Sequence, residues 1–150
     1  MIALQFHAGR TLSTRIVQLA TWSWTSHVDV ELPDGNLIGA VPGEGVVIRD
    51  SATINAKRIE RFFVDTTKQQ NRAIYKAIES QLGAPYDWGG VLGIGFHRNW
   101  QAYDSWFCSE LVTWAFAGAG VSLLRTDRAW RITPRDLLLS PLLKNEKSNG

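Results

Sequence analysis

The chain has 150 residues, a length typical of one domain with its own hydrophobic core, so we expect a single domain over residues 1–150. Its composition, 45% hydrophobic and 20% charged, argues against disorder, and its net charge of +2 is too small to indicate nucleic-acid binding. The single cysteine excludes an intramolecular disulfide framework and a zinc site built from several cysteines.

The start of the chain does not have the pattern of a signal peptide, and no apolar run reaches the length of a membrane span. We therefore expect synthesis in the cytoplasm and no integral membrane segment, unless the chain is the processed form of a longer one. A role outside the cytoplasm would then need delivery by lysis, by a phage particle or by a secretion machine.

The first half of the chain alternates between strand and helix patterns. Residues 2–6 predict a short strand, and a turn at residues 9–11 opens a helix. The apolar face of that helix is expected to consist of Leu12, Ile16, Leu19 and Ala20. The strand predicted at residues 27–32 alternates, with Val28, Val30 and Leu32 on one face and His27, Asp29 and Glu31 on the other.

A hairpin turn is predicted at residues 33–36, followed by strands at 37–41, 46–48 and 58–64. Thr66 or Thr67 is expected to cap a helix that Gly83 ends. Residues 85–103 have no regular pattern, and residues 145–150 form a polar tail that we expect to be frayed. The whole pattern predicts an α+β fold.

The only cysteine begins a helical pattern whose apolar residues are Leu111, Val112, Ala115, Phe116 and Ala119. Ser105 is the expected cap, and Glu110 lies in the first turn, where a carboxylate suits the helix dipole. At a helix N-terminus the dipole lowers the pKa of a thiol, which would make Cys108 a reactive thiolate. The alternative is a buried structural cysteine, which is common among free cysteines.

A cysteine nucleophile needs a base, and the chain has three histidines. His7 follows the first predicted strand and His97 lies in the irregular segment, so both are expected to be structural or solvated. His27 opens a strand with its side chain on the polar face. A histidine on a strand beside a cysteine on a helix is the arrangement of papain-type enzymes, so His27 is the candidate base.

Three segments resemble papain-like cell-wall peptidases of the NlpC type. They are residues 26–28 with 33–35 (SHV and PDG), 83–90 (GAPYDWGG) and 107–112 (FCSELV). Residues 133–137 (TPRDL) resemble the circularly permuted branch of these enzymes. His27 precedes Cys108, whereas in the common NlpC order the cysteine comes first. This order is similar to that of the circularly permuted branch of bacterial papain-like amidases, which includes the lecithin retinol acyltransferase group.

The resemblance implies a circularly permuted papain-like fold, in which an antiparallel sheet packs against the helix that bears Cys108. It also implies thiol-dependent hydrolysis of an amide through an acyl-enzyme, without a cofactor or a metal ion. Cys108 would attack and His27 would act as base and then as acid. Tyr86 and the Cys108 backbone N–H would hold the substrate carbonyl.

The resemblance favours an amide bond of a peptidoglycan stem peptide as the substrate. Two alternatives stay open: hydrolysis or transfer of a lipid amide or ester, and a papain-like binding domain without catalysis. An alkylatable Cys108 with a lowered pKa would favour the enzyme, and an inert thiol would favour the binding domain. The sequence does not determine the oligomeric state.

In one position the chain departs from the family. A polar residue on the strand after the hairpin usually orients the catalytic imidazole, and here that position is Gly39. Asp29 is the candidate replacement, with Glu31, Glu44 or a water molecule as alternatives, and it is also compatible with a solvated strand face. Residues two apart on a strand are separated by ~6.5–7 Å, so we expect a water bridge between Asp29 and His27 rather than direct contact.

Overall fold

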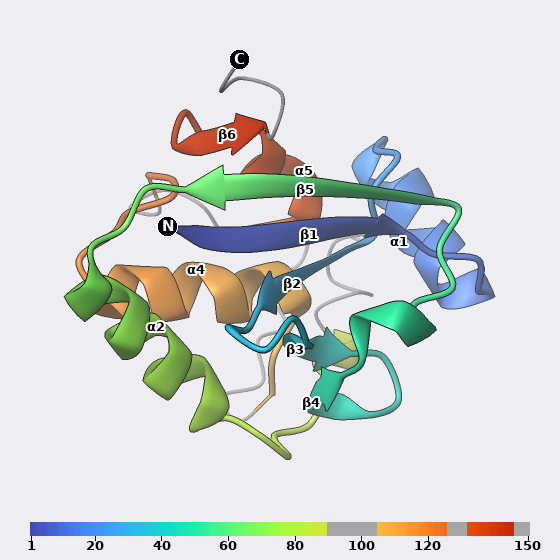
Figure 1. Cartoon of the computed structure of the whole chain (residues 1–150). Coiled ribbons are helices and arrows are strands. Elements are labelled where there is room, and N and C mark those ends of the chain that lie inside the picture. The colour runs from blue at the N-terminus through green and yellow to red at the C-terminus, as the bar shows by residue number, and fades with distance from the viewer. Residues whose placement is uncertain (90–104, 126–131, 146–150) are drawn as a thin grey trace.

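The computed structural model describes residues 1–89, 105–125 and 132–145. Its centre is an antiparallel sheet with the strand order β4-β3-β2-β1-β5-β6 (Figure 1). The strands are β1 (Ile2–Ala8), β2 (His27–Glu31), β3 (Leu37–Val41), β4 (Gly45–Arg49), β5 (Arg58–Val64) and β6 (Leu143–Asn145). An α+β fold with an antiparallel sheet is what the sequence predicts.

The helices are α1 (Leu12–Thr21), α2 (Lys68–Glu79), α4 (Cys108–Gly118) and α5 (Pro134–Leu138), with a short 3-10 helix η1 (Ser51–Thr53). Thr67 caps α2, and the Gln70 side chain bonds back to the Thr67 backbone, so two free helix-end donors are satisfied. Thr133 and Asp136 form the same box at α5. Within the described ranges no helix is both long and apolar enough to cross a membrane.

One face of the sheet forms the hydrophobic core against α2 and α4 (Figure 1). The buried residues there include Leu4, Phe6, Val28, Val30, Ile38, Ile74, Ile78, Leu111, Val112 and Phe116. Because successive side chains of a strand point to opposite faces, the residues between them point away from this core. His7 on β1 and His27 with Asp29 on β2 are therefore placed on the opposite face of the sheet.

Three local predictions are wrong at the ends or faces of elements. On α1, the predicted core residues Ile16 and Leu19 are 48% and 77% exposed, whereas Val17 is buried. β1 extends to Ala8 because it pairs with β5 up to that residue, so His7 lies inside the strand. Asn145 belongs to β6, which pairs with β5, rather than to a frayed tail. His97 and residues 146–150 lie outside the described residues.

Candidate functional site

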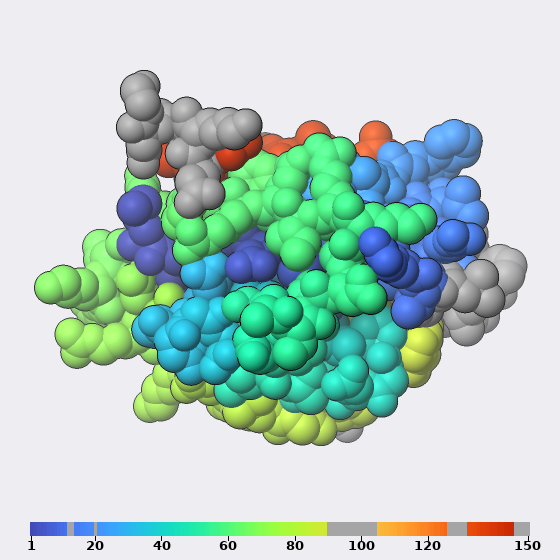
Figure 2. All heavy atoms as spheres, turned by 45° about the vertical axis from the view of Figure 1, so that its right-hand side comes forward, coloured from blue at the N-terminus to red at the C-terminus, as the bar shows by residue number. Residues whose placement is uncertain are grey.

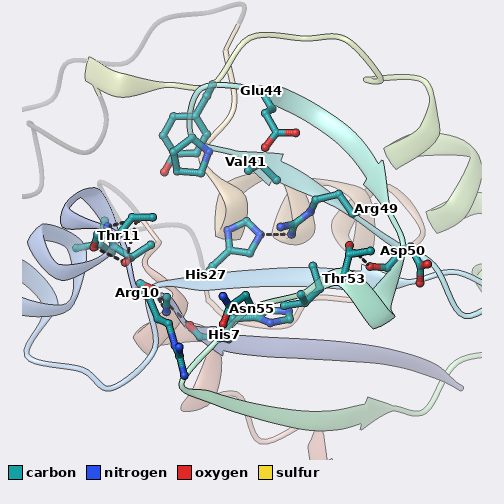
Figure 3. A pocket seen from close by; sticks show the side chains of 18 of the residues that line it. His7, Arg10, Thr11, His27, Val41, Glu44, Arg49, Asp50, Thr53 and Asn55 are labelled. Atoms are coloured by element: carbon teal, nitrogen blue, oxygen red, sulfur yellow. Dashed lines mark hydrogen bonds between the residues drawn. The ribbon is translucent and has the colours of Figure 1, made fainter.

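A pocket of about 660 Å³ opens beside His7 and His27. Residues from β1, α1, β2, the β3–β4 turn, β4 and η1 line it, together with Tyr86 and Trp88. Figure 2 shows the side of the molecule on which β5 lies above β4 and η1, with α1 at its edge. In Figure 3, His27 and Arg49 point toward each other inside this pocket and Arg10 lies near its rim.

Asp29 is completely buried and contacts His27 directly. The His27 Nε2 and Asp29 Oδ1 atoms lie 2.8 Å apart, so no water separates the two side chains. The expected water bridge is therefore wrong. The two side chains lean toward each other along the strand. Their polar atoms are therefore closer together than the ~6.5–7 Å between residues two apart on an ideal strand.

The glycine at position 39 makes this contact possible. β3 runs beside β2, and a Cβ atom at Gly39 would lie 2.0 Å from Asp29 Oδ1 and 3.1 Å from the carboxyl carbon. Non-bonded heavy atoms do not approach so closely. The Asp29 carboxylate therefore fills the space that a side chain at position 39 would need. The Asp29 carboxylate of β2 thus occupies the space at the β3 position where the resembled family carries a polar group.

Two further side chains hold the other oxygen of Asp29. The Arg49 Nη2 atom on β4 lies 2.6 Å from Asp29 Oδ2. The His7 Nε2 atom on β1 lies 3.2 Å from the same oxygen, although its direction is outside that of a regular hydrogen bond. Neither role is predicted from the sequence, in which His7 is expected to be structural or solvated and Arg49 is not a candidate. The pairing of β1 with β2 places His7 directly opposite His27, which is the signal that would have indicated it.

These neighbours keep Asp29 ionised. Burial alone would raise the pKa of this carboxyl, but the charges and hydrogen bonds of His27, His7 and Arg49 outweigh it and hold the pKa well below its usual range. An ionised carboxylate only accepts hydrogen bonds, so His27 Nε2 must carry a hydrogen. Arg49 Nη2 also lies 3.2 Å from His27 Nε2, because both donors converge on Asp29. In the neutral imidazole the lone pair is then on Nδ1.

Cys108 is the first residue of α4, and its side chain is fully buried. The expected cap is wrong: the N-cap is Phe107, which makes no side-chain bond, and Ser105 Oγ is buried without a partner among the described residues. The pairing of β2 with β3 covers only Val30 with Ile38 and Glu31 with Leu37. Nearer the start of β2, before these paired residues, the backbone of Val28 hydrogen-bonds to Cys108. The thiol therefore lies beside the strand segment that bears His27.

The pKa of Cys108 is raised, not lowered. Burial raises it to about 12, and hydrogen bonds from the backbone of Val28 and Ser109 offset only part of this effect. The charge of Asp29 acts in the same direction as burial. The expected lowering by the helix dipole is therefore wrong, because the dipole acts on an atom that water does not reach. The thiol is protonated at neutral pH.

Tyr86 lies beside the start of α4. Hydrogen bonds of 2.9 Å from Gly83 N to Val46 O and from Val46 N to Ala84 O hold its segment along β4. On its other side Tyr86 forms a parallel bridge with Trp106, two residues before Cys108. Its ring packs against Phe107 with a centroid distance of 6.1 Å, and it lines the pocket. The structure thus brings Tyr86 to the end of α4 where the cysteine is.

The other candidate carboxylates do not take the place of Asp29. Glu31 bonds to Arg61, with 2.8 Å between Arg61 Nε and Glu31 Oε2, and to Gln5, with 3.0 Å between Gln5 Nε2 and the same oxygen. Glu44 is exposed at the pocket (Figure 3). Of the three carboxylates that the sequence indicates, Asp29 is the one in contact with His27.

The described residues contain no group of three His, Cys, Asp or Glu side chains placed to hold a metal ion. His7, His27 and Asp29 do converge, but the Arg49 guanidinium lies on the Asp29 oxygen that such an ion would need. A fixed cation already compensates the carboxylate there, and the donor set does not fit a second one.

Parts of the sequence are similar to mycobacterial peptidases. The chain is 37% identical over 70 residues to a probable endopeptidase of Mycobacterium tuberculosis and 36% identical over 81 residues to the peptidoglycan endopeptidase RipB of that organism. These matches cover 47% and 50% of this chain but 16% and 31% of the relatives, so the chain spans less than a third of their length. No protein-family model matches the sequence.

The fold is similar to that of the metalloprotein YiiX from Escherichia coli O157:H7. The TM-score to its crystal structure is 0.74, over 95% of this chain and 93% of that chain, at 16% sequence identity. At this identity the likeness establishes a shared fold.

Replacing Asp29 by alanine should slow turnover by about a hundredfold or more, because His27 loses the group that fixes its tautomer. The matched control is Glu31→Ala, which removes a carboxylate two residues further along the same strand face and should change turnover by less than about twofold. Initial rates on a substrate that the wild type cleaves decide the matter. Equal rates for the Asp29 variant and the wild type would show that Asp29 does not orient the base.

Gly39→Ala should slow turnover as Asp29→Ala does, since the new methyl group displaces the carboxylate from His27. In the double variant the second substitution should add little, because there is then no carboxylate to displace. A double-mutant cycle on initial rates measures this coupling. Additive losses, or a gain of activity from Gly39→Ala, would contradict the assignment of the space at position 39 to Asp29.

Alkylation of Cys108 by iodoacetamide should be slow at neutral pH. Because the thiolate fraction falls with each unit below a pKa of about 12, the rate should increase about tenfold per pH unit into the alkaline range. Mass spectrometry of quenched samples gives the rates, and the urea-unfolded chain, in which burial is lost, is the control. A rate that levels off near neutral pH would mean that the thiolate is already formed in the folded protein.

Proposed function

We propose that the chain is a circularly permuted papain-like cysteine hydrolase that cleaves amide bonds through an acyl-enzyme. The observation that carries this proposal is the buried Asp29 carboxylate in contact with His27 Nε2, on the strand whose backbone bonds to Cys108. A carboxylate, an imidazole and a thiol in this order are the components of a cysteine nucleophile with an oriented base.

The reaction starts from the neutral thiol. As the Cys108 sulfur attacks the substrate carbonyl carbon, His27 Nδ1 takes the thiol proton, and the carbonyl oxygen becomes an oxyanion. The Cys108 backbone N–H and the Tyr86 hydroxyl donate to this oxyanion. His27 then gives the proton to the leaving amine, and the carbon–nitrogen bond breaks to leave a thioester. A water molecule, deprotonated by His27, hydrolyses the thioester and restores the thiol.

The raised pKa of Cys108 decides which form of this mechanism we propose. A thiol with a pKa of about 12 does not form a stable thiolate–imidazolium pair at neutral pH, so proton transfer must accompany the attack. An inert thiol in the free protein is also what a binding domain would have. Against a binding domain stands the cost of an ionised, fully buried Asp29, which has no evident use in a site that only binds.

For the substrate we propose an amide bond in a peptidoglycan stem peptide. The partial similarity to RipB, described as a peptidoglycan endopeptidase, supports this choice. The pocket of about 660 Å³ has the size of a site for a short peptide segment, and charged groups such as Arg10 and Glu44 line it.

A second candidate is hydrolysis or transfer of a lipid amide or ester. One observation favours it: Ile16 and Leu19 on α1 and Trp22 directly after it are 48%, 77% and 87% exposed, and Thr14 and Val17 of the same helix line the pocket. Exposed apolar residues along one side of a helix suit contact with a lipid surface.

Digestion of purified cell-wall sacculi, followed by mass spectrometry of the products, tests the proposal. The wild type should release fragments cleaved at an amide of the stem peptide, and Cys108→Ala should release none while keeping the circular dichroism spectrum of the wild type. The control is Ser122→Ala, which changes an exposed residue outside the pocket lining. Release of fragments by Cys108→Ala at the wild-type rate would end the nucleophile assignment.

If sacculi stay intact, the same pair of proteins is incubated with lipid amides and esters in vesicles. Cleavage by the wild type and none by Cys108→Ala would establish the second candidate instead. No Cys108-dependent cleavage of either substrate would favour the binding domain.

A further inference from the structure

The mechanism above uses His27 as the base and leaves a second buried histidine of the same pocket without a role. His7 is 3% exposed and lines the pocket, and its ring lies 5.9 Å from the His27 ring, between centroids. The two residues face each other across β1 and β2. A buried polar ring at this place needs a compensating interaction, and Asp29 is the group within reach.

The two histidines contact different oxygens of one carboxylate. His27 Nε2 lies 2.8 Å from Asp29 Oδ1, and His7 Nε2 lies 3.2 Å from Asp29 Oδ2. Asp29 is ionised, so an approach of the His7 lone pair would be repulsive, and His7 Nε2 must be the ring atom that carries a hydrogen. The contact of His7 Nε2 with Asp29 Oδ2 is electrostatic, because its direction is outside that of a regular hydrogen bond, and His7 Nδ1 is a buried acceptor without a partner among the described residues. Leaving His7 Nδ1 unpaired costs less free energy than removing an N–H group from the buried charge of Asp29.

The position of His7 opposes a rotation of the Asp29 carboxylate that would break its contact with His27. Arg49 also holds Oδ2, but its side chain is 23% exposed and comes from β4, on the far side of β3 from β2. With Arg49 alone on Oδ2, the carboxylate can rotate about its Cβ–Cγ bond toward the guanidinium and turn Oδ1 away from His27. The His7 N–H on β1, at the opposite side of β2, attracts Oδ2 and opposes this rotation.

We propose that His7 is a positioning residue of the site: by holding Asp29 Oδ2 from β1, it keeps Oδ1 on His27 Nε2 and so keeps the His27 lone pair on Nδ1. This inference rests on the proposed cysteine hydrolase for its effect on turnover. Its effect on the His27 tautomer is independent of any substrate.

Two substitutions of similar polarity separate positioning from simple space filling. His7→Gln puts an amide N–H where His7 Nε2 lies, whereas the shorter side chain of His7→Asn does not reach Asp29. The matched control is Gln5→Asn, because Gln5 lies two residues away on the same strand face and bonds to Glu31, a carboxylate of β2 outside the site. All three proteins are compared with the wild type as full-length chains.

The first measurement is the ¹⁵N chemical shifts of the His27 ring, assigned by their loss in His27→Gln. In the wild type, His7→Gln and Gln5→Asn, Nε2 should carry the hydrogen and Nδ1 the lone pair. In His7→Asn the two ring nitrogens should move toward a mixture of tautomers. An unchanged His27 tautomer in a folded His7→Asn protein would overturn the proposal, whether or not a substrate is known.

The second measurement is turnover on the substrate found in the digestion experiment. His7→Asn should lower kcat by about tenfold with KM changed by less than about twofold, and His7→Gln should recover most of the loss. Equal losses in His7→Asn and His7→Gln would mean that His7 acts through its shape and not as a donor. If the wild type cleaves nothing, the proposed function fails, and the tautomer measurement still decides the role of His7.

Discussion

The site depends on one buried carboxylate. A fully buried and ionised Asp29 would be costly without partners, and four neighbouring strands supply what it needs. His7 comes from β1, His27 lies on β2 with Asp29 itself, and Arg49 comes from β4. β3 contributes empty space at Gly39. Four neighbouring strands, in the order β4-β3-β2-β1, therefore each contribute part of the site.

Burial also determines the protonation state of Cys108, the proposed nucleophile. Cys108 lies at a helix N-terminus, where the helix dipole stabilises a thiolate. Because the thiol has no access to water, desolvation destabilises the thiolate by more than the dipole stabilises it. The same desolvation has opposite outcomes at two neighbouring positions. Asp29 keeps its charge because cationic and donor groups surround it, whereas Cys108 has backbone donors and a nearby negative charge and keeps its proton.

The sequence predicts those parts of the structure that local patterns determine. The alternation around His27, the hairpin after it, the Thr67 cap and the start of α4 at Cys108 all follow from spacing and turn chemistry. His7 and Arg49 escape sequence reasoning because their roles depend on which strands lie side by side and in which register. The direction of the Cys108 pKa shift depends on the packing of the whole domain, which no local pattern specifies.

Position 39 shows how a missing residue can mislead. A glycine where the resembled family carries an orienting side chain suggests, by itself, that the imidazole of His27 is not oriented. Together with Asp29 it has the opposite meaning, because a carboxylate on β2 can occupy that space only if β3 carries no side chain there. The two residues form one feature: Asp29 needs Gly39 for room, and His27 needs Asp29 for its tautomer. In a sequence of this kind the pair, and not either position alone, indicates whether the histidine is oriented.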